Sequence, residues 1–342
     1  MKFLKKIIRK VYTYIYYMLS LVRIIFESLI YKNRIYLFGI PIHGNLGDQA
    51  ILYAEEEFLK ENFENLHVIE IESNIVRKFS KLLKLLVKDN VILVHGGGFL
   101  GTLWLNEEIM FRTVLENFPN NNVIVFPQTA YFSNDEDGKK ILNESQKIYA
   151  KHKKLYICCR EKYSYDFMKK NFSSCNILLI PDMVLYLNGI NNNKDKKNVL
   201  FCIRNDKEKV KYDFDNLKSK LSDFTFTETD MVVQNNIYLF NRKKHLYNKI
   251  NEFSNYKLII TDRLHGMVFS LLAGVPCLVF ENKSYKIKGV YEWISDIDSV
   301  RLYNENTLDK DISELLELNY NYTNKKLKSN YKELIKLIKK SL

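Results

Sequence analysis

The sequence predicts an α/β protein with two doubly wound parallel sheets that face one another across a cleft. Short apolar strands alternate with segments of helical periodicity over most of the chain, as in parallel sheets covered by helices. Polar or glycine residues repeatedly follow the predicted strand ends. The asparagine- and lysine-rich segment 188–198 interrupts this alternation, which then restarts, so the segment marks a boundary between two domains.

Each predicted element of the first domain follows from a simple pattern. An apolar run predicts a strand, and apolar residues at helical spacing predict a helix. Strands are expected at 34–40, 66–72, 91–94, 123–126, 155–159 and 177–180. Helices are expected at 49–62, 75–88, 106–118 and 138–151, with one more after Glu161.

The same pattern resumes in the second half of the chain. Strands are expected at 199–203, 224–230 and 258–260, with a further short strand that ends at Phe280. Helices are expected at 207–221, at 235–253 and after the turn 261–266. We divide the chain into an N-terminal helix (1–32), a first domain (33–190), a linker (191–198), a second domain with the ligand site (199–320) and a basic C-terminal helix (321–342) that returns to the first domain.

Composition restricts the function classes. The formal charge is +12, but residues 1–32 and 325–342 each hold seven Lys or Arg against one Glu, so the body between them is neutral. Nucleic-acid enzymes more often have a basic cleft in the body, so nucleic acid is not an expected ligand. The five Cys form no CxxC pair. This indicates reduced, buried thiols in a cytoplasmic protein and argues against a zinc site.

The N-terminal segment is predicted to be a basic amphipathic helix. Its apolar residues recur at helical spacing from Leu4 to Leu29. The uncharged run 11–22 has 12 residues, too short to cross a bilayer, for which about 20 are needed. Because cations flank the apolar stripe, we expect the helix to rest on the anionic inner face of the plasma membrane. Packing on its own domain or on a second subunit is the alternative.

The loop 44–48 follows the first predicted strand and opens a helix. Its glycines let backbone amides approach a ligand, and a helix N-terminus favours an anion. The loop matches neither a P-loop nor a dinucleotide-binding fingerprint. We expect Asp48 to cap the helix and Asn45 to face a ligand.

Three successive glycines, Gly96, Gly97 and Gly98, follow the third predicted strand. They indicate either close approach of a ligand to the backbone or tight packing between strand and helix. His95, directly before them, is expected to be a core histidine whose hydrogen bonds are satisfied.

Two arginines occupy matching positions in the two domains. Arg160 and Arg204 each follow a buried strand, where a guanidinium grips phosphate or carboxylate. For a single arginine a surface ion pair is the usual role, and Glu161 is an available partner for Arg160. Asp182 follows another strand end, where it orients a hydroxyl or caps the next turn.

The turn 261–266 carries the sharpest chemical signal. Arg263 and His265 are two residues apart at the start of a helix, so both can reach one ligand, and Gly266 follows at the mouth of that helix. Arg263 is expected to hold an anion and His265 to transfer a proton near neutral pH. The structural alternative is that Arg263 pairs with Asp262 and His265 caps the helix.

Several segments together resemble the polysaccharide pyruvyl transferase family. They are GNLGDQAI (44–51), HGGGFLG (95–101), FPQT (126–129), CCRE (158–161), PDMV (181–184) and TDRLHGMVFSLLAGVPCLVF (261–280). The resemblance runs from about Gly39 to about Trp293. It covers neither the N-terminal helix nor the tail, and it does not identify the acceptor.

The resemblance implies two Rossmann-like domains in a GT-B-like arrangement. It also implies phosphoenolpyruvate as donor and, as acceptor, two hydroxyls of a sugar in a cell-surface polysaccharide or its lipid-linked precursor. The product is then a cyclic pyruvate ketal, with no nucleotide, flavin or metal required. By motif, Arg263 and His265 match the family's donor-site pair. Arg204 is a further donor contact, and Gly266 completes the donor-binding candidates. The candidates on the acceptor or cleft side are Asn45, Asp48, Gly96, Gly97, Gly98, Arg160 and Asp182.

Two other functions stay open at this point. A GT-B-type glycosyltransferase would bind a nucleotide sugar in the same cleft. A non-catalytic assembly component of a capsule or exopolysaccharide complex would use the two basic ends as its surfaces. The sequence does not decide whether the protein is an oligomer.

Overall fold

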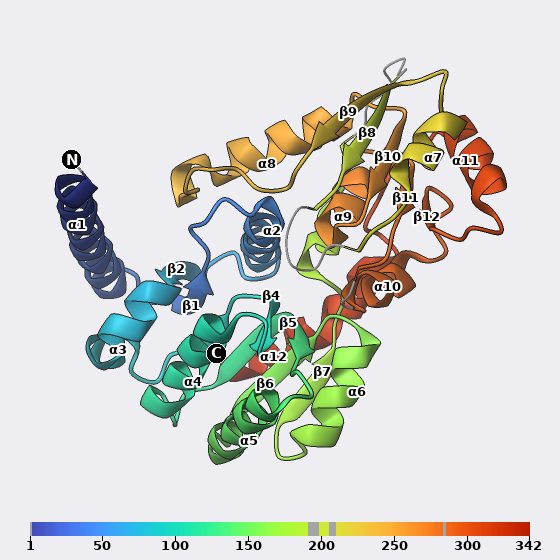
Figure 1. Cartoon of the computed structure of the whole chain (residues 1–342). Coiled ribbons are helices and arrows are strands. Elements are labelled where there is room, and N and C mark those ends of the chain that lie inside the picture. The colour runs from blue at the N-terminus through green and yellow to red at the C-terminus, as the bar shows by residue number, and fades with distance from the viewer. Residues whose placement is uncertain (1, 191–197, 205–209, 283–284) are drawn as a thin grey trace.

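The structure is a computed structural model. It describes residues 2–190, 198–204, 210–282 and 285–342, of which residues 2–10 by their backbone alone (Figure 1). Most of the predicted linker therefore lies outside the described residues. The chain starts with helix α1 (Lys2–Ile30) and then enters the first sheet.

The first domain has one sheet with helices on both faces. Its strands are β1 (Arg34–Ile40), β2 (His67–Glu72), β3 (Ile92–Val94), β4 (Gly97–Gly101), β5 (Val123–Tyr131), β6 (Leu155–Cys159) and β7 (Asn176–Leu179). Its helices are α2 (Leu46–Asn62), α3 (Ser73–Val87), α4 (Leu105–Asn117), α5 (Glu136–Lys151) and α6 (Lys162–Asn171), followed by the 3-10 helix η1 (Met183–Tyr186).

The second domain repeats this plan on a smaller scale. Its strands are β8 (Asn198–Cys202), β9 (Thr225–Thr229), β10 (Leu258–Thr261), β11 (Cys277–Val279) and β12 (Val300–Leu302). Its helices are α7 (Phe214–Lys220), α8 (Leu239–Phe253), α9 (Leu264–Leu272), α10 (Lys286–Tyr291) and α11 (Leu308–Glu317), with the 3-10 helix η2 (Glu292–Ile294). The chain ends with η3 (Leu327–Tyr331) and α12 (Lys332–Ser341).

The strand orders bring two topological switch points together. The first sheet runs β2-β1-β3-β5-β6-β7, with β4 beside β5, and the second runs β12-β11-β10-β8-β9. The paired strands are parallel, for example β1 with β3 and β8 with β10. The order reverses between β1 and β3 and again between β8 and β10. Ligands bind beyond the carboxyl ends of strands at such points, and the predicted fold class is confirmed.

Buried apolar strands hold the loops at these edges in place. In β1, residues Ile35 to Phe38 are fully buried, as in parallel strands covered on both faces. Burying one large apolar side chain contributes about 1.5–3 kcal/mol. The loops that leave these strands are therefore anchored at their bases.

Most predicted elements agree with the structure within a few residues, and three differ. No strand was expected at the glycine triplet, but Gly97 to Gly101 form strand β4 on β5. Gly97 makes this route available with a φ of 128°, a conformation that other residues rarely adopt. Strand β5 continues through Pro127, where its register with β6 shifts. In the described part of 207–221, only Phe214 to Lys220 are α-helical.

Backbone hydrogen bonds join the two domains on one side of the cleft. The amide of Leu46 donates to the carbonyl oxygen of Met231 (2.8 Å), and that of Val233 donates to Gly44 O (2.8 Å). At the other side the tail crosses back to the first domain. Tyr331 Oη donates to the carbonyl oxygen of Asp182 (2.7 Å), and Ile338 in α12 is fully buried.

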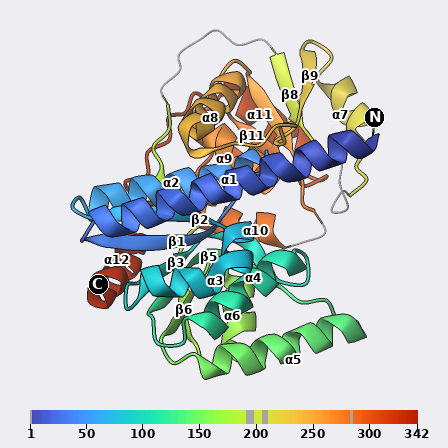
Figure 2. The same cartoon turned by 90° about the vertical axis from the view of Figure 1, so that its left-hand side faces the viewer.

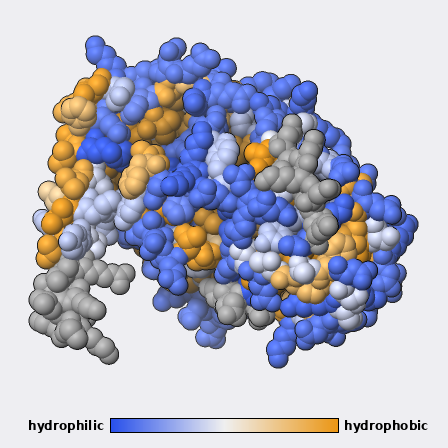
Figure 3. Space-filling view, turned by 90° about the horizontal axis from the view of Figure 1, so that it is seen from above, coloured by the Kyte–Doolittle hydropathy of each residue, from blue (hydrophilic) through white to orange (hydrophobic). Residues whose placement is uncertain are grey.

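Helix α1 lies on the outside of the first domain, near β2 and α3 (Figure 2). Its inner side buries Tyr17, Leu21 and Ile24. Its outer side exposes an apolar face, visible as an orange strip along the left edge of Figure 3. The face comprises Val11, Ile15, Met18, Leu19, Val22, Phe26 and Leu29. The predicted apolar stripe is therefore not the side that packs on the domain.

The expectation that this segment is too short to cross a bilayer is wrong. By length and composition, the 20-residue stretch Val11–Ile30 is long and apolar enough to do so, and 22% of its apolar window is buried against the protein. Arg23, which ends the uncharged run, forms an ion pair with Glu27 one turn further along the helix (3.1 Å). Pairing lowers the cost of placing these charges near lipid.

Candidate active site

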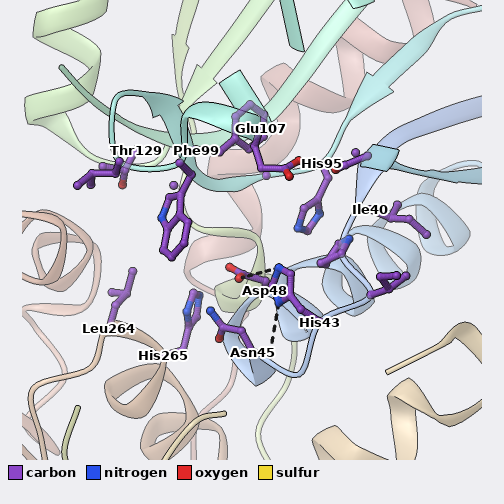
Figure 4. A pocket seen from close by; sticks show the side chains of 18 of the residues that line it. Ile40, His43, Asn45, Asp48, His95, Phe99, Glu107, Thr129, Leu264 and His265 are labelled. Atoms are coloured by element: carbon purple, nitrogen blue, oxygen red, sulfur yellow. Dashed lines mark hydrogen bonds and ion pairs between the residues drawn. The ribbon is translucent and has the colours of Figure 1, made fainter. Parts of the chain in front are cut away.

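A cavity of about 460 Å³ lies between the two domains, within the usual size range of ligand sites. Its walls come from the loops after β1 and β3 on one side and from those after β8 and β10 on the other. The two switch points therefore face the same space. Figure 4 shows His95, from the first domain, and His265, from the second, on opposite sides of this space.

Basic side chains outnumber acidic ones among the residues that line the cavity. The basic residues are Arg77, Arg160, Arg204, Arg263 and Lys286, whereas the acidic ones are Asp48, Glu72 and Glu107. Of these cations, Arg77 has a carboxylate partner in Glu107, Arg160 in Asp182 and Arg263 in Asp230. No group of three or more His, Cys, Asp or Glu side chains suited to a metal ion occurs in the described part of the chain.

Hydrogen bonds through Thr261 hold the turn after β10 and tie it to the neighbouring strand β8. Thr261 Oγ1 donates to the carbonyl oxygen of Cys202 (2.6 Å) and accepts from the backbone amide of Arg263 (3.1 Å). Gly266 packs against Thr261, where an added Cβ would lie 2.3 Å from Oγ1. Gly266 therefore sits behind the turn and does not line the cavity.

Arg263 is the N-cap residue of α9, and its side chain reaches the cavity. Its Nη2 lies 2.5 Å from Asp230 Oδ1. The expected alternative pairing with Asp262 is wrong. Asp262 instead accepts a hydrogen bond from the backbone amide of Arg204 (2.8 Å). That bond ties the loop after β8 to the loop after β10.

His265 stands above a buried ion pair. Asp182, only 1% exposed, accepts from Arg160 Nη1 (2.8 Å) and from the amide of Val184 (2.9 Å). Its Oδ2 lies 3.7 Å from His265 Nε2, an electrostatic contact and not a hydrogen bond. Burial alone would raise the pKa of Asp182, but His265 and Arg160 hold it below its ordinary value. The ionised carboxylate thus places negative charge under the imidazole.

The N-terminus of α2 forms the other side of the His265 pocket. Asn45 is its N-cap, accepting from the amide of Gly47 (3.0 Å). The prediction that Asp48 caps this helix is therefore wrong. Asp48 lies in the first turn, 3.7 Å from His43 (Figure 4). An added Cβ on Gly47 would lie 2.3 Å from His265 Nδ1, so glycine is required for this approach.

His95 directly follows β3 and differs from the core histidine with satisfied hydrogen bonds that was expected. Its Nδ1 lies 2.9 Å from Oε2 of Glu55, whose Oε1 accepts from the amide of Gly96 (2.7 Å). Its Nε2 is buried and has no hydrogen-bond partner in the part of the chain that the structure describes. Gly98 lies on the same wall, where an added Cβ would meet Arg160 Nη2 at 3.3 Å.

Most of the predicted site residues meet at the cavity. Those on its wall are Asn45, Asp48, Gly96, Gly98, Arg160, Arg204, Arg263 and His265. Gly97, Gly266 and Asp182 are not among the residues that line it. Asp182 lies directly beneath Arg160 and His265, and it also caps η1.

The sequence reasoning missed several lining residues, namely His43, Arg77, Trp104, Glu107 and Lys286. They come from helices and loops without a motif, so their position depends on how distant segments pack. A signal existed for His95, because it directly precedes the glycines. Its partner Glu55 lies within a run of three glutamates, and nothing in the sequence distinguishes it from the other two.

Known proteins resemble this chain over most of its length. A model of the family described as polysaccharide pyruvyl transferase matches residues 45–284. General stress protein 30 of Bacillus subtilis is 36% identical over 286 residues, covering 82% of this chain and 83% of that protein. Pyruvyl transferase 1 of Schizosaccharomyces pombe is 27% identical over 313 residues, covering 84% and 76%.

A solved structure extends the comparison to the fold. UDP-GlcNAc 2-epimerase from Methanocaldococcus jannaschii aligns with a TM-score of 0.50 at 13% identity, covering 90% of this chain and 99% of that one. At this identity only the arrangement of two facing Rossmann-like domains carries over, as in GT-B enzymes. The family model, by contrast, spans well over half of the sequence. The chain therefore belongs to the polysaccharide pyruvyl transferase family and is a pyruvyl transferase of polysaccharide modification.

Proposed function

We propose that this pyruvyl transferase takes its pyruvyl group from phosphoenolpyruvate and joins it as a cyclic ketal to two hydroxyls of one sugar. One observation carries the proposal. Arg263 and His265 reach, from a single rigid turn, into a cavity lined by more basic than acidic side chains. Phosphoenolpyruvate has a carboxylate, a phosphate and a methylene carbon that must accept a proton.

The side chains divide these tasks between them. Arg263 and Arg204 bind the two anionic groups of the donor, since guanidinium groups match carboxylate and phosphate. His265 delivers a proton to the methylene carbon, and ionised Asp182 stabilises the imidazolium before transfer. The central carbon then becomes electrophilic. One sugar hydroxyl attacks it, and a second displaces phosphate and closes the ring.

The acceptor side of the cavity has an aromatic surface. Trp104 lines the cavity and is 54% exposed, and Phe99 and Leu103 lie beside it on the wall. A half-exposed indole offers a sugar ring a flat apolar face. We place the saccharide, free or lipid-linked, against Trp104 with its hydroxyls toward the histidines.

Phosphate release from phosphoenolpyruvate, measured with a panel of methyl hexopyranosides and lipid-linked hexoses, tests the proposal. His265→Ala and Arg263→Ala should each lower transfer at least about 100-fold. Phosphoenolpyruvate should still raise the melting temperature of His265→Ala, but not that of Arg263→Ala. Full transfer by both variants would refute the assignment. Stabilisation of the wild type by UDP and not by phosphoenolpyruvate would favour a sugar-nucleotide donor.

We further propose that α1 holds the protein on the anionic inner face of the plasma membrane. Its exposed apolar face is available to lipid, and Lys2, Lys5, Lys6, Arg9 and Lys10 precede that face in the sequence. Replacing Leu19, Val22 and Phe26 together by Gln leaves the buried side of the helix unchanged. This variant should lose binding to vesicles that contain phosphatidylserine, and wild-type binding should weaken with salt.

Three outcomes separate the possible roles of this face. Resistance of wild-type protein to alkaline extraction from membranes would indicate a spanning helix and not a surface helix. A dimer that the triple variant abolishes, without vesicle binding by the wild type, would assign the face to a second subunit. Unchanged vesicle binding by the variant would remove α1 from the explanation.

A further inference from the structure

His95 and Glu55 form a buried pair that the proton transfer by His265 does not use. Glu55 is fully buried on α2, and His95 is 4% exposed at the end of β3. The two side chains are 2.9 Å apart. The pair lies in the first domain, whereas Arg263 and His265 come from the second, yet His95 and His265 line the same cavity (Figure 4).

The hydrogen bonds of Glu55 define which nitrogen of His95 is available. Its Oε1 accepts from the amide of Gly96 (2.7 Å) and its Oε2 contacts His95 Nδ1. With the carboxylate ionised, both oxygens accept, so Nδ1 carries the proton and Nε2 keeps its lone pair. Nε2 has no hydrogen-bond partner within the described residues. Leaving such a group unsatisfied is unfavourable, and a ligand hydroxyl that donates to it would offset this cost.

We propose that His95 is a second catalytic residue, the general base that accepts the proton of the attacking sugar hydroxyl, with Glu55 as its positioning residue. The inference rests on the proposed phosphoenolpyruvate chemistry. That reaction needs an acid and a base at the same time, because the methylene gains a proton while a hydroxyl loses one. Histidines on opposite walls of one cavity meet this need.

With His265 as acid and His95 as base, every proton in the reaction has a donor and an acceptor. The imidazolium of His265 gives its proton to the methylene carbon. The first hydroxyl oxygen bonds to the central carbon as its proton moves to His95 Nε2. The C–O bond to phosphate then breaks, its electron pair leaves with the phosphate, and His95 returns its proton to that group. The second hydroxyl closes the ketal and reprotonates His265, so both histidines end as they began.

The charges around His95 determine its pH dependence. Burial would lower the pKa of His95, but Glu55 and, more weakly, Asp48 raise it above its ordinary value, while Arg242 opposes them. A base acts only when it is deprotonated. The rate of transfer should therefore increase with pH, and the midpoint of this rising limb should lie above the ordinary pKa of histidine.

His95→Asn is the decisive variant, because its amide N–H can still donate to Glu55 while no atom replaces Nε2. With phosphoenolpyruvate and the acceptor panel, it should lose about 100- to 10,000-fold in kcat and lack the rising pH limb. Phosphoenolpyruvate should still raise its melting temperature as in the wild type. Glu55→Gln should move the limb to lower pH, an effect that a purely structural role would not produce.

Two outcomes overturn the inference in different ways. A folded His95→Asn that binds phosphoenolpyruvate and keeps the wild-type rate and pH limb removes His95 from the chemistry, leaving the proposed function intact. If His95→Asn does not fold, His95→Gln with the same measurements decides. A wild type that phosphoenolpyruvate neither stabilises nor engages in phosphate release overturns the proposed function and this inference with it.

Discussion

Substituting Gly47 by alanine should displace His265 although the two residues are far apart in the sequence. The virtual Cβ of Gly47 lies 2.3 Å from Nδ1 and 2.7 Å from Cγ of the imidazole. Ordinary van der Waals contact begins at 3.4 Å, so the ring and the N-terminus of α2 must separate by about 1 Å. A misplacement of about 1 Å in a catalytic group costs about 100-fold in rate.

Stability should respond much less than activity to this change. Overpacking costs about 1–3 kcal/mol, but alanine offsets part of that through its better helix propensity, by about 1 kcal/mol. Gly47 donates its backbone amide to Asn45, and alanine retains that donor. The expected result is a folded protein whose melting temperature falls only slightly, with kcat for phosphate release about 100-fold lower.

A double-mutant cycle with His265→Ala identifies the cause. Once the imidazole is absent, the closest remaining contact for an added methyl at position 47 is Cβ of residue 265 at 3.1 Å, which requires a shift of only a few tenths of an ångström. Gly47→Ala should then cause little further loss in that background, which gives a coupling of about 2–3 kcal/mol. An equal loss of activity in both backgrounds, or a wild-type rate for the single variant, would refute the reasoning.

Two further predictions concern the floor and the rim of the same cavity. Asp182→Asn should destabilise the protein by about 3–5 kcal/mol, because Arg160 keeps its buried charge without a partner. The pKa of Asp182 is lower in the folded than in the unfolded protein, so its contribution to stability is present above about pH 4 and is lost as the pH falls further. In urea unfolding, the wild type should therefore lose stability with falling pH in this range, and the variant should lack this loss. The same pH dependence in both proteins would contradict the prediction. Trp104→Ala should raise the KM for methyl hexopyranosides about tenfold with kcat unchanged, equal to ~1.4 kcal/mol of acceptor binding. A loss of phosphoenolpyruvate binding in Trp104→Ala would instead place the donor against the indole.

The fold was predictable because its signals are local. Parallel strands buried on both faces are continuous apolar runs, and the residues after them lie at the edge where ligands bind. This reasoning led to Arg204, Arg263 and His265. Strand β4 was not predictable, since three glycines favour a turn until the neighbouring strand β5 supplies a partner for them.

The details of the site were hidden for a different reason. Glu55 meets His95 across 40 positions, and Gly47 approaches His265 across more than 200. No periodicity or spacing in one sequence contains such a contact. The helix cap shows the same limit on a smaller scale. Both Asn45 and Asp48 are residue types that cap helices well, and the path of the backbone into α2 places Asn45 at the N-cap position.

The division of chemistry between two domains explains why their contact is reinforced by charge. Arg242 on α8 is almost fully buried and reaches into the first domain, where its Nη2 lies 3.0 Å from Glu70 Oε2 and its Nε 3.1 Å from Gln49 Oε1. Glu56 also contacts Arg242, and burial together with Glu70 raises the pKa of Glu56 to about 9. Buried ion networks contribute little net stability, but breaking one partner costs several kcal/mol, so such a network favours one relative placement. Because His265 and Arg263 lie in one domain and His95 in the other, that placement determines whether the proposed acid, base and anion-binding arginine meet in one cavity.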